Sequence, residues 1–196
     1  MRIIAGALRS RRIEAPAGLS TRPTSDRLRE TLFNVLAPRI HDSVFLDLYA
    51  GSGAVGIEAL SRGARQVVFV ERVPAALKVL RLNLQRLGLT SGFRVCHESV
   101  ASFFRGPRSG AVEFDLVFLD PPYDATGEYE TTLGLLGAVD LHPRPEHPNL
   151  GWLAARSVVI AEHRRKQKLE DCYGALHRTR LLQQGDAALS FYELPS

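Results

Sequence analysis

The sequence predicts an α/β fold, in which helices cover both faces of a mostly parallel sheet that an antiparallel hairpin closes. Apolar strand patterns alternate with helix patterns through the middle of the chain, as expected for consecutive strand–helix–strand units. A glycine-rich turn, residues 51–56, joins the first of these strands to the next helix. Near the C-terminus, Gln184-Gly185-Asp186 separates two further strand patterns, which indicates a hairpin.

The predicted elements follow one another with short connections. Residues 1–20 alternate loosely and predict a small β-ribbon, and a helix capped near Ser25 carries an apolar stripe as far as Pro38. Strands are expected at 44–49, 66–71, 93–97, 114–120, 157–163, 174–182 and 187–194. Helices are expected at 54–62, 74–87, 100–104, 128–138 and 146–155.

The composition excludes several classes of protein. Hydrophobic residues make up 45% of the 196 and charged residues 23%, which is ordinary for a globular domain and unlike collagen or a disordered chain. There is no apolar run long enough to span a membrane, and the N-terminus lacks the apolar stretch of a secretory signal. The two cysteines, Cys96 and Cys172, lie far apart and outside metal-binding spacings. We therefore expect a cytoplasmic protein without disulfides or zinc.

Positive charge is concentrated at the start of the chain. The first 30 residues hold seven arginines and three acidic residues, so they account for the whole net charge of +4. Such a segment is typical of a surface that binds a polyanion, and the planar fork of arginine suits phosphates and guanine edges. The residues expected to contact nucleic acid are Arg2, Arg9, Arg11, Arg12, Arg22 and Arg27.

The turn after the first parallel strand has the pattern G-x-G-x-x-G, formed by Gly51, Gly53 and Gly56. Glycines bring backbone N–H groups close to a ligand, and Glu71, at the end of the next strand, can accept both hydroxyls of a ribose. By itself this pattern fits NAD, FAD or S-adenosylmethionine. Asp47, in the strand, would repel a pyrophosphate and attract an ammonium or sulfonium, which favours S-adenosylmethionine.

A second motif, Asp120-Pro121-Pro122-Tyr123, ends the strand expected at 114–120. Prolines fix φ and donate no hydrogen bond, so the carbonyls of Asp120 and Pro121 are expected to face outward from a rigid turn. Together with the Asp120 carboxylate they would accept the two N–H bonds of an exocyclic amine and free its lone pair for attack on a methyl group. Tyr123 offers an aromatic face for a base turned out of its stack. All four are expected to be catalytic residues.

The two motifs and the N-terminal sequence together resemble a known family. DLYAGSGAVGIEALSRGA, Glu71 and LDPPY are similar to S-adenosylmethionine-dependent amino-methyltransferases of nucleic acids. RIIAGALRSRRI and TRPTSDRLRETLFNVL are similar to one family among them, the 16S rRNA guanine-N2 methyltransferases that act on the P-site hairpin of the small subunit. The similarity runs from Arg2 to the last strand, ALSFYEL, and RPTSDRLRETLFN is its most specific segment.

The resemblance implies a Rossmann-like class I methyltransferase fold with a seven-stranded sheet whose last strand is antiparallel. It divides the chain into an N-terminal RNA-binding ribbon, residues 1–20, and a methyltransferase domain, residues 21–196. The implied partner is 16S rRNA, the small ribosomal subunit or its assembly intermediate. We expect a monomer that uses neither a metal nor a membrane.

The resemblance also implies where the cofactor lies, with its methionine part near the glycine turn and its ribose on Glu71. After the third strand the family normally offers an acidic or amide side chain to the adenine, but this chain has Ser99. Glu98, Ser99 or the backbone alone could therefore serve. The residues expected to bind the cofactor are Asp47, Tyr49, Ala50, Gly51, Ser52, Gly53, Glu71, Arg72, Ser99 and Val100.

Three other functions compete with this interpretation. A DNA adenine-N6 or cytosine-N4 methyltransferase has the same turn but usually needs a separate target-recognition domain. A nicotinamide-dependent oxidoreductase explains the glycine turn and leaves the Asp-Pro-Pro-Tyr motif without a role. A non-catalytic RNA-binding protein would use the basic segment alone. Among single residues, His163 is expected to be a hydrogen-bonded strand end. Arg29 is expected either to contact the substrate or the cofactor lid or to belong to a solvated helix face.

Overall fold

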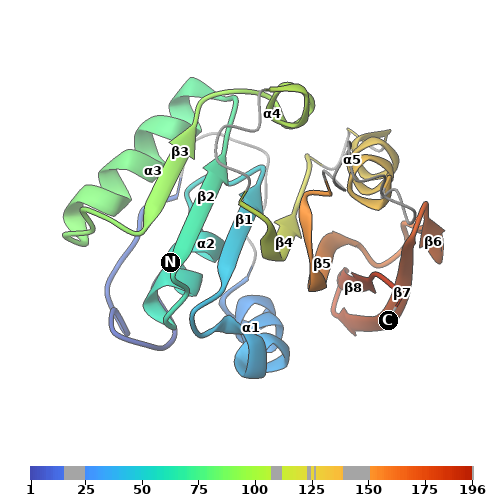
Figure 1. The fold of residues 1–196 in the computed structure, drawn as a ribbon. Coiled ribbons are helices and arrows are strands. Elements are labelled where there is room, and N and C mark those ends of the chain that lie inside the picture. The colour runs from blue at the N-terminus through green and yellow to red at the C-terminus, as the bar shows by residue number, and fades with distance from the viewer. Residues whose placement is uncertain (16–24, 107–111, 123–124, 126, 139–150, 196) are drawn as a thin grey trace.

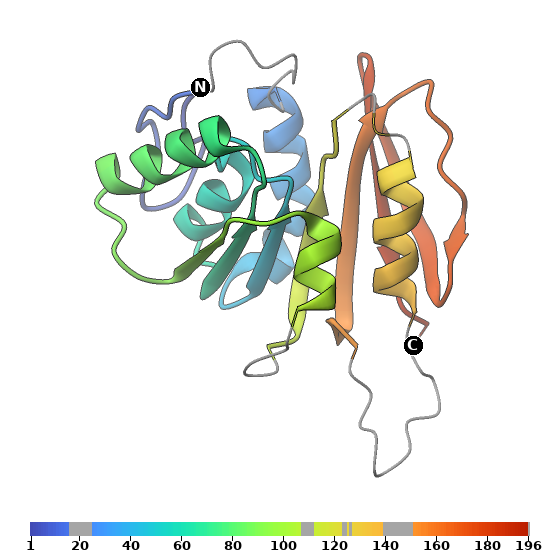
Figure 2. The same cartoon turned by 90° about the horizontal axis from the view of Figure 1, so that it is seen from above.

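The computed structural model describes residues 1–15, 25–106, 112–122, 125, 127–138 and 151–195. These residues form an eight-stranded sheet with the order β3-β2-β1-β4-β5-β8-β7-β6 and helices on both faces (Figures 1 and 2). The strands are β1 Val44–Leu48, β2 Gln66–Val70, β3 Phe93–Cys96, β4 Phe114–Leu119, β5 Leu153–Arg164, β6 Cys172–Tyr173, β7 Leu176–Gln184 and β8 Ala187–Glu193. The helices are α1 Asp26–Ile40, α2 Ala54–Ser61, α3 Pro74–Arg86, α4 Val100–Arg105 and α5 Gly127–Gly137. Within the described chain, no helix has both the length and the apolar character needed to cross a bilayer.

The predicted fold class is confirmed. Strands β1 to β5 pair in parallel, and the hairpin of β7 and β8 adds antiparallel pairs at one edge. The sheet has eight strands rather than seven, because Cys172–Tyr173 pairs with β7 as a short extra strand.

One predicted helix, 146–155, is wrong where the structure describes it. Residues 153–155 begin β5, and Leu153 pairs with Phe114 of β4. Leucine and alanine are good helix formers, but pairing with a buried neighbouring strand overrides that local preference. Residues 146–150 lie outside the described part of the chain.

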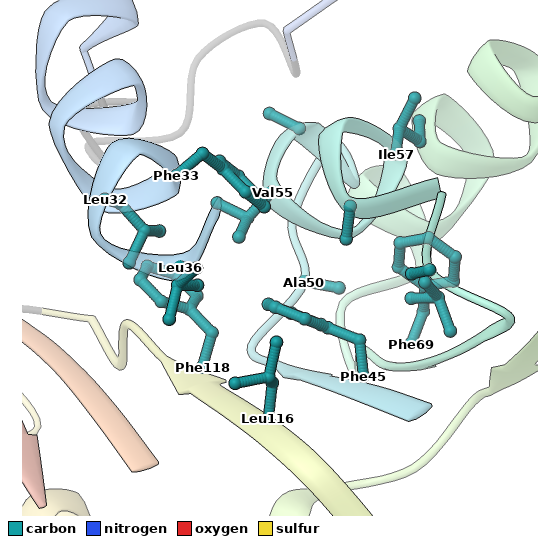
Figure 3. Close-up of a cluster of buried hydrophobic side chains, with 14 of the residues drawn as sticks. Leu32, Phe33, Leu36, Phe45, Ala50, Val55, Ile57, Phe69, Leu116 and Phe118 are labelled. Carbon is teal, nitrogen blue, oxygen red and sulfur yellow. The ribbon is translucent and has the colours of Figure 1, made fainter. Parts of the chain in front are cut away.

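The core has two halves, one on each face of the sheet. Helices α1, α2 and α3 cover one face, called here the α1–α3 face, and α4 and α5 cover the other (Figure 2). Side chains along each strand alternate between the two halves, so each half receives every second residue. Figure 3 shows part of the α1–α3 half, where Phe33 of α1 stacks on Phe45 of β1 with ring centroids 6.4 Å apart.

The N-terminal segment, residues 1–15, packs against the helices of the α1–α3 face. The expected ribbon is reduced to a single antiparallel bridge between Arg2 and Arg12, with a turn between them. Ile3 and Ile13 flank the bridge and are buried in the same hydrophobic cluster as α1 and α2. The segment is therefore anchored by apolar burial as well as by hydrogen bonds.

A buried carboxylate on α2 fixes this segment in place. Glu58 is fully buried and accepts the backbone N–H groups of Ile4 at 2.8 Å and Ala5 at 3.0 Å. Arg29 of α1 is also fully buried; its Nε lies 3.7 Å from Glu58, and its Nη2 donates to the carbonyl of Arg2 at 2.5 Å. Arg62, the residue after α2, also pairs with Glu58, at 2.7 Å. The expectation that Arg29 lies on a solvated helix face is wrong, because its guanidinium is buried and shares the charge of Glu58 with Arg62.

Candidate functional site

Four acidic side chains lie at the carboxyl ends of four neighbouring parallel strands. Two positions before each acid in the chain is a hydrophobic side chain that is buried on the α1–α3 face. Because every second side chain of a strand points to the same face, all four acids lie on that face. We call them the acidic row. In their order across β2, β1, β4 and β5, its members are Glu71, Asp47, Asp120 and Glu162.

The glycine turn brings the backbone between β1 and α2 close to this row. Gly53 caps α2 with a φ of +79°, a conformation that a side chain would strain. A Cβ on Gly56 would lie 2.3 Å from the ring of Phe69, so this glycine allows α2 to pack directly on β2. Both roles agree with the G-x-G-x-x-G interpretation of the sequence.

Two members of the row hold the turn through backbone hydrogen bonds. Asp47 is buried and accepts the N–H of Gly56 at 2.8 Å. Glu71 accepts the N–H of Gly51 at 2.8 Å and that of Val73 at 2.7 Å. Within the described residues, neither carboxylate has an ion-pair partner. Burial, with a smaller contribution from the charge of Glu71, raises the pKa of Asp47 to about 8 despite its hydrogen bond to Gly56.

The described structure identifies one supporting residue that the sequence analysis missed. Asn83 of α3 is buried, and its amide donates to the carbonyls of Ser52 and Glu14, both at 3.0 Å. It also accepts the N–H of Glu14 at 2.9 Å. One side chain thus connects the glycine turn to the N-terminal segment. A polar residue on the apolar face of a predicted helix is the signal that could have revealed it.

Tyr49 lies at the start of the glycine turn with a φ of +60°, which is uncommon for a residue with a side chain. Its hydroxyl donates to Glu128 of α5 at 2.7 Å and lies 2.9 Å from the hydroxyl of Thr132. Burial raises the pKa of Tyr49, so the hydroxyl keeps its proton and remains a donor. The hydroxyl is therefore directed toward α5.

The expected adenine-binding residues lie at the start of α4. Ser99 caps this helix, since its hydroxyl accepts the N–H of Ser102 at 3.1 Å and donates to the Ser102 hydroxyl. Val100 is buried at the first helical position, where the helix itself provides no acceptor for the backbone N–H. Glu98 is half-buried just before the cap, and Arg72, on the neighbouring strand end, is exposed.

The Asp-Pro-Pro turn follows β4, next to the glycine turn that follows β1. The Pro122 carbonyl accepts the N–H of Ala125 at 2.8 Å, so it is used within the turn itself. Asp120 is half-buried, and burial together with the charges of Glu162 and Asp47 raises the pKa of its carboxyl well above the usual range. Pro121 is buried. Tyr123, the fourth residue of the motif, lies outside the described residues.

The end of β5 adds a residue that the sequence analysis did not select. Glu162 is only 2% exposed and occupies the register position opposite Asp120, one residue beyond the Leu119–Ala161 pair. An acid near the carboxyl end of a buried strand, as on the other three strands, is the signal that could have identified it.

His163, the next residue, is hydrogen-bonded as expected. Its Nδ1 donates to the carbonyl of Arg164 and its Nε2 lies 2.9 Å from the hydroxyl of Ser190. Burial lowers the pKa of His163, which favours the neutral ring.

The predicted nucleic-acid contacts are placed on the surface. Arg2, Arg9, Arg11, Arg12 and Arg27 are exposed, whereas Arg22 lies outside the described residues. Figure 2 shows that the N-terminus and the start of α1 lie toward the side on which β4 and β5 end. The N-terminus and the start of α1 are therefore on the same side of the molecule as the acidic row.

This geometry agrees with what the chain is similar to. A family model described as conserved hypothetical protein 95 matches residues 1–193. The chain belongs to this family. One relative, "Putative rRNA methyltransferase YlbH" of Bacillus subtilis, is 34% identical over 193 residues, which is 98% of each chain. Another, "Ribosomal RNA small subunit methyltransferase D" of Escherichia coli K12, is 38% identical over 162 residues, covering 83% of this chain and 74% of that protein.

A solved structure is similar over nearly the same extent. "Putative methyltransferase yhhF" from Escherichia coli superposes with a TM-score of 0.80 at 33% sequence identity, covering 99% of this chain and 97% of that one. The resemblance to the 16S rRNA methyltransferase family, stated above from sequence motifs, is confirmed. The methyltransferase fold expected from it is confirmed as well.

Proposed function

We propose that this chain transfers a methyl group from S-adenosylmethionine to the N2 amine of a guanine in 16S rRNA. The relatives named as rRNA methyltransferases support the reaction on rRNA. The proposal that the target is the N2 amine of guanine rests on the Asp120-Pro121-Pro122 turn. This turn follows β4, which pairs directly with β1, the strand that leads into the glycine turn. An acceptor for an amine and a site for a cationic methyl donor would thereby lie side by side.

The residues around the glycine turn fit S-adenosylmethionine. Asp47 and Glu71 are buried carboxylates whose described hydrogen bonds come from backbone N–H groups. The raised pKa of Asp47 reflects the cost of burying this charge without a cation. An ammonium or sulfonium would compensate that cost. When bound, the cofactor supplies the activated methyl group together with positive charge.

Other contacts of the cofactor follow from the fold. Glu71 has lone pairs left to accept the ribose hydroxyls, because each oxygen accepts one described N–H bond. The hydroxyl of Ser99 is used in capping α4, so we assign the adenine to Glu98 and the backbone N–H of Val100. Ala50, Gly51, Ser52 and Gly53 would contact the methionine part through their backbone.

The Asp120-Pro121-Pro122 turn would hold the target amine. The Asp120 carboxylate and the Pro121 carbonyl accept its two N–H bonds, and the proline rings keep donors away from this corner. Asp120 ionises more readily beside a positive charge, so cofactor binding prepares it to accept the amine. Tyr123 would stack on the flipped base.

Position is the main contribution of the protein to the rate, since a sulfonium methyl needs no further activation. The acceptors at residues 120 and 121 fix the amine nitrogen in line with the methyl. The methyl would leave the sulfonium, with the S–C bond broken and S-adenosylhomocysteine as the leaving group. Asp120 would accept the excess proton of the methylated amine and release it to solvent. The enzyme would act as a cytoplasmic monomer on free rRNA, on the small subunit or on its assembly intermediate.

The proposal is tested by incubating the protein with labelled S-adenosylmethionine and either 30S particles, naked 16S rRNA or DNA. Digestion of the labelled product to nucleosides should give N2-methylguanosine from rRNA. Asp120→Asn should lower kcat on the order of 100-fold or more, while the Kd for the cofactor product changes little. Asp186→Asn, the same change in the exposed β7–β8 turn, is the matched control. Transfer to DNA alone, or to an adenine or cytosine amine, would overturn the proposal.

A further inference from the structure

We propose that Glu162 is the residue that selects guanine, by accepting a hydrogen bond from the ring N1–H beside the target amine. This inference rests on the proposed function, because it concerns the base that the Asp120 turn would hold. It assigns a role to a buried acid that the chemistry of methyl transfer does not itself use.

Strand register places Glu162 beside the amine-binding corner. Leu119 of β4 pairs with Ala161 of β5, so the next residues, Asp120 and Glu162, are neighbours across two parallel strands. Strand alternation puts both on the α1–α3 face. Neighbouring strands are about 4.8 Å apart, which suits two acceptors serving adjacent donors of one flat base. The charge of Glu162 also contributes to the raised pKa of Asp120, as expected for carboxylates that lie close together.

The surroundings hold the Glu162 backbone firmly. Tyr129 of α5 donates its hydroxyl to the Glu162 carbonyl at 2.7 Å. On the other edge of β5, Glu162 pairs with Leu189 of β8, so it lies inside the sheet rather than on a free edge. The residue as a whole is 2% exposed. A carboxylate has about four lone-pair sites, so Glu162 can accept a ring N–H of the substrate in addition to its contacts within the protein.

The chemistry of the bases makes this contact selective. In guanine the ring nitrogen next to the exocyclic amine carries a hydrogen and donates. In adenine (N1) and in cytosine (N3) the corresponding nitrogen is an acceptor. A carboxylate at this position therefore attracts guanine and repels the other two bases, although all three present an amine to the Asp-Pro-Pro turn. Glu162 would thus make the enzyme specific for guanine and exclude the adenine and cytosine targets of the related DNA methyltransferases.

The test compares guanine with 2-aminopurine at the target position. 2-Aminopurine keeps the 2-amine, but its N1 is an acceptor. The methylated position of the rRNA is first located by mass spectrometry of its fragments. Ligated 16S rRNA with either base at that position is then supplied in the form that the wild-type enzyme methylates, free or in reconstituted particles. We expect the wild type to prefer guanine in kcat/KM by roughly 10- to 100-fold. In Glu162→Gln the amide can turn its NH2 group toward an acceptor, so this preference should fall close to one.

The controls separate specificity from folding and from the reaction itself. The preference is a ratio measured on one enzyme, so partial loss of folded protein leaves it unchanged. Glu130→Gln, the same substitution at an exposed position of α5, should keep the wild-type preference. Equal values of kcat/KM for both bases in the wild type, or an unchanged preference in Glu162→Gln, would overturn the role of Glu162. Neither outcome would affect the proposal that the enzyme methylates guanine. Absence of N2-methylguanosine with the wild type would instead overturn the proposed function.

Discussion

The hydroxyl of Tyr49, at the start of the glycine turn, donates to the carboxylate of Glu128 in α5 at 2.7 Å. The same hydroxyl lies 2.9 Å from Thr132, one turn further along the helix. Helix α5 follows the Asp-Pro-Pro turn in the chain. A single side chain therefore ties the proposed cofactor loop to the element that comes after the proposed base-binding corner.

Tyr49→Phe should weaken cofactor binding, because the left-handed backbone at residue 49 loses the hydrogen bonds that help to hold it. Each such bond contributes about 1 kcal/mol, so we expect the Kd of S-adenosylhomocysteine, measured by calorimetry, to rise roughly 5- to 10-fold. Tyr173→Phe removes a hydroxyl that accepts the N–H of Glu170 near the far edge of the sheet, and it serves as the control. Equal Kd values for both variants would mean that Tyr49 does not position the loop.

Asp47→Asn should change how stability depends on pH. Burial raises the pKa of Asp47 to about 8 in the folded protein, whereas an unfolded chain has a value near its usual ~3.9. The folded state therefore binds more protons between these values, and its stability falls as pH rises through about 8. Urea unfolding of the cofactor-free protein should show this fall in the wild type and a shallower one in the variant. The fall does not vanish in the variant, because the pKa of Asp120 is also raised and this residue likewise lowers the free energy of unfolding as pH rises.

The same variant should also bind cofactor less tightly, since the amide keeps the acceptor for the Gly56 N–H but lacks the negative charge. If the pH profile of the free energy of unfolding were as steep in Asp47→Asn as in the wild type, Asp47 would not be the group that titrates. Saturating cofactor should flatten the wild-type profile, because a nearby cation lowers the pKa of the buried acid.

Arg29→Ala should destabilise the protein by about 1.5–3 kcal/mol. The substitution removes one of the two guanidinium groups that face the buried Glu58, the other being that of Arg62, and it leaves the Arg2 carbonyl without its donor. Arg27→Ala, an exposed position on the same helix, should change stability by no more than about 0.5 kcal/mol. The change in stability of each variant is measured from the shift of its denaturant midpoint, provided that the m-value is unchanged. A similar loss in the two variants would contradict the role of the Arg29–Glu58 pair.

Replacing Arg9 and Arg12 by serine should weaken rRNA binding and flatten its salt dependence. Both side chains are exposed, so the fold should be retained, whereas deletion of the segment would also remove the buried Ile3 and Ile13. The slope of log Kd against log salt should decrease by roughly 0.7–0.9 for every phosphate that the variant no longer neutralises. Serine at Arg156 and Arg180, exposed residues of β5 and β7, is the charge-matched control. If the Arg156 and Arg180 variant changed the slope as much as the Arg9 and Arg12 variant, the effect would come from net charge alone and not from phosphate contacts of the N-terminal segment.

The sequence alone was sufficient to predict most of the order of strands and helices, apart from residues 153–155 and the short strand β6, and the positions of the two motifs along the chain. Buried parallel strands and amphipathic helices have local periodicities. Gly53 marks a turn whose backbone favours glycine, and Gly56 marks the close packing of α2 on β2. Since ligands settle at the carboxyl ends of parallel strands, these local signals also indicated where Asp47 and Asp120 would meet.

Tertiary structure decided what local pattern does not encode. Pairing between β4 and β5 made residues 153–155 a strand and set Glu162 beside Asp120, although the two acids are far apart in the sequence. Burial made Arg29 one of the two arginines that face Glu58, rather than a surface charge. Strand register and burial are properties of segments distant in the chain, so the composition of any one segment does not specify its neighbours.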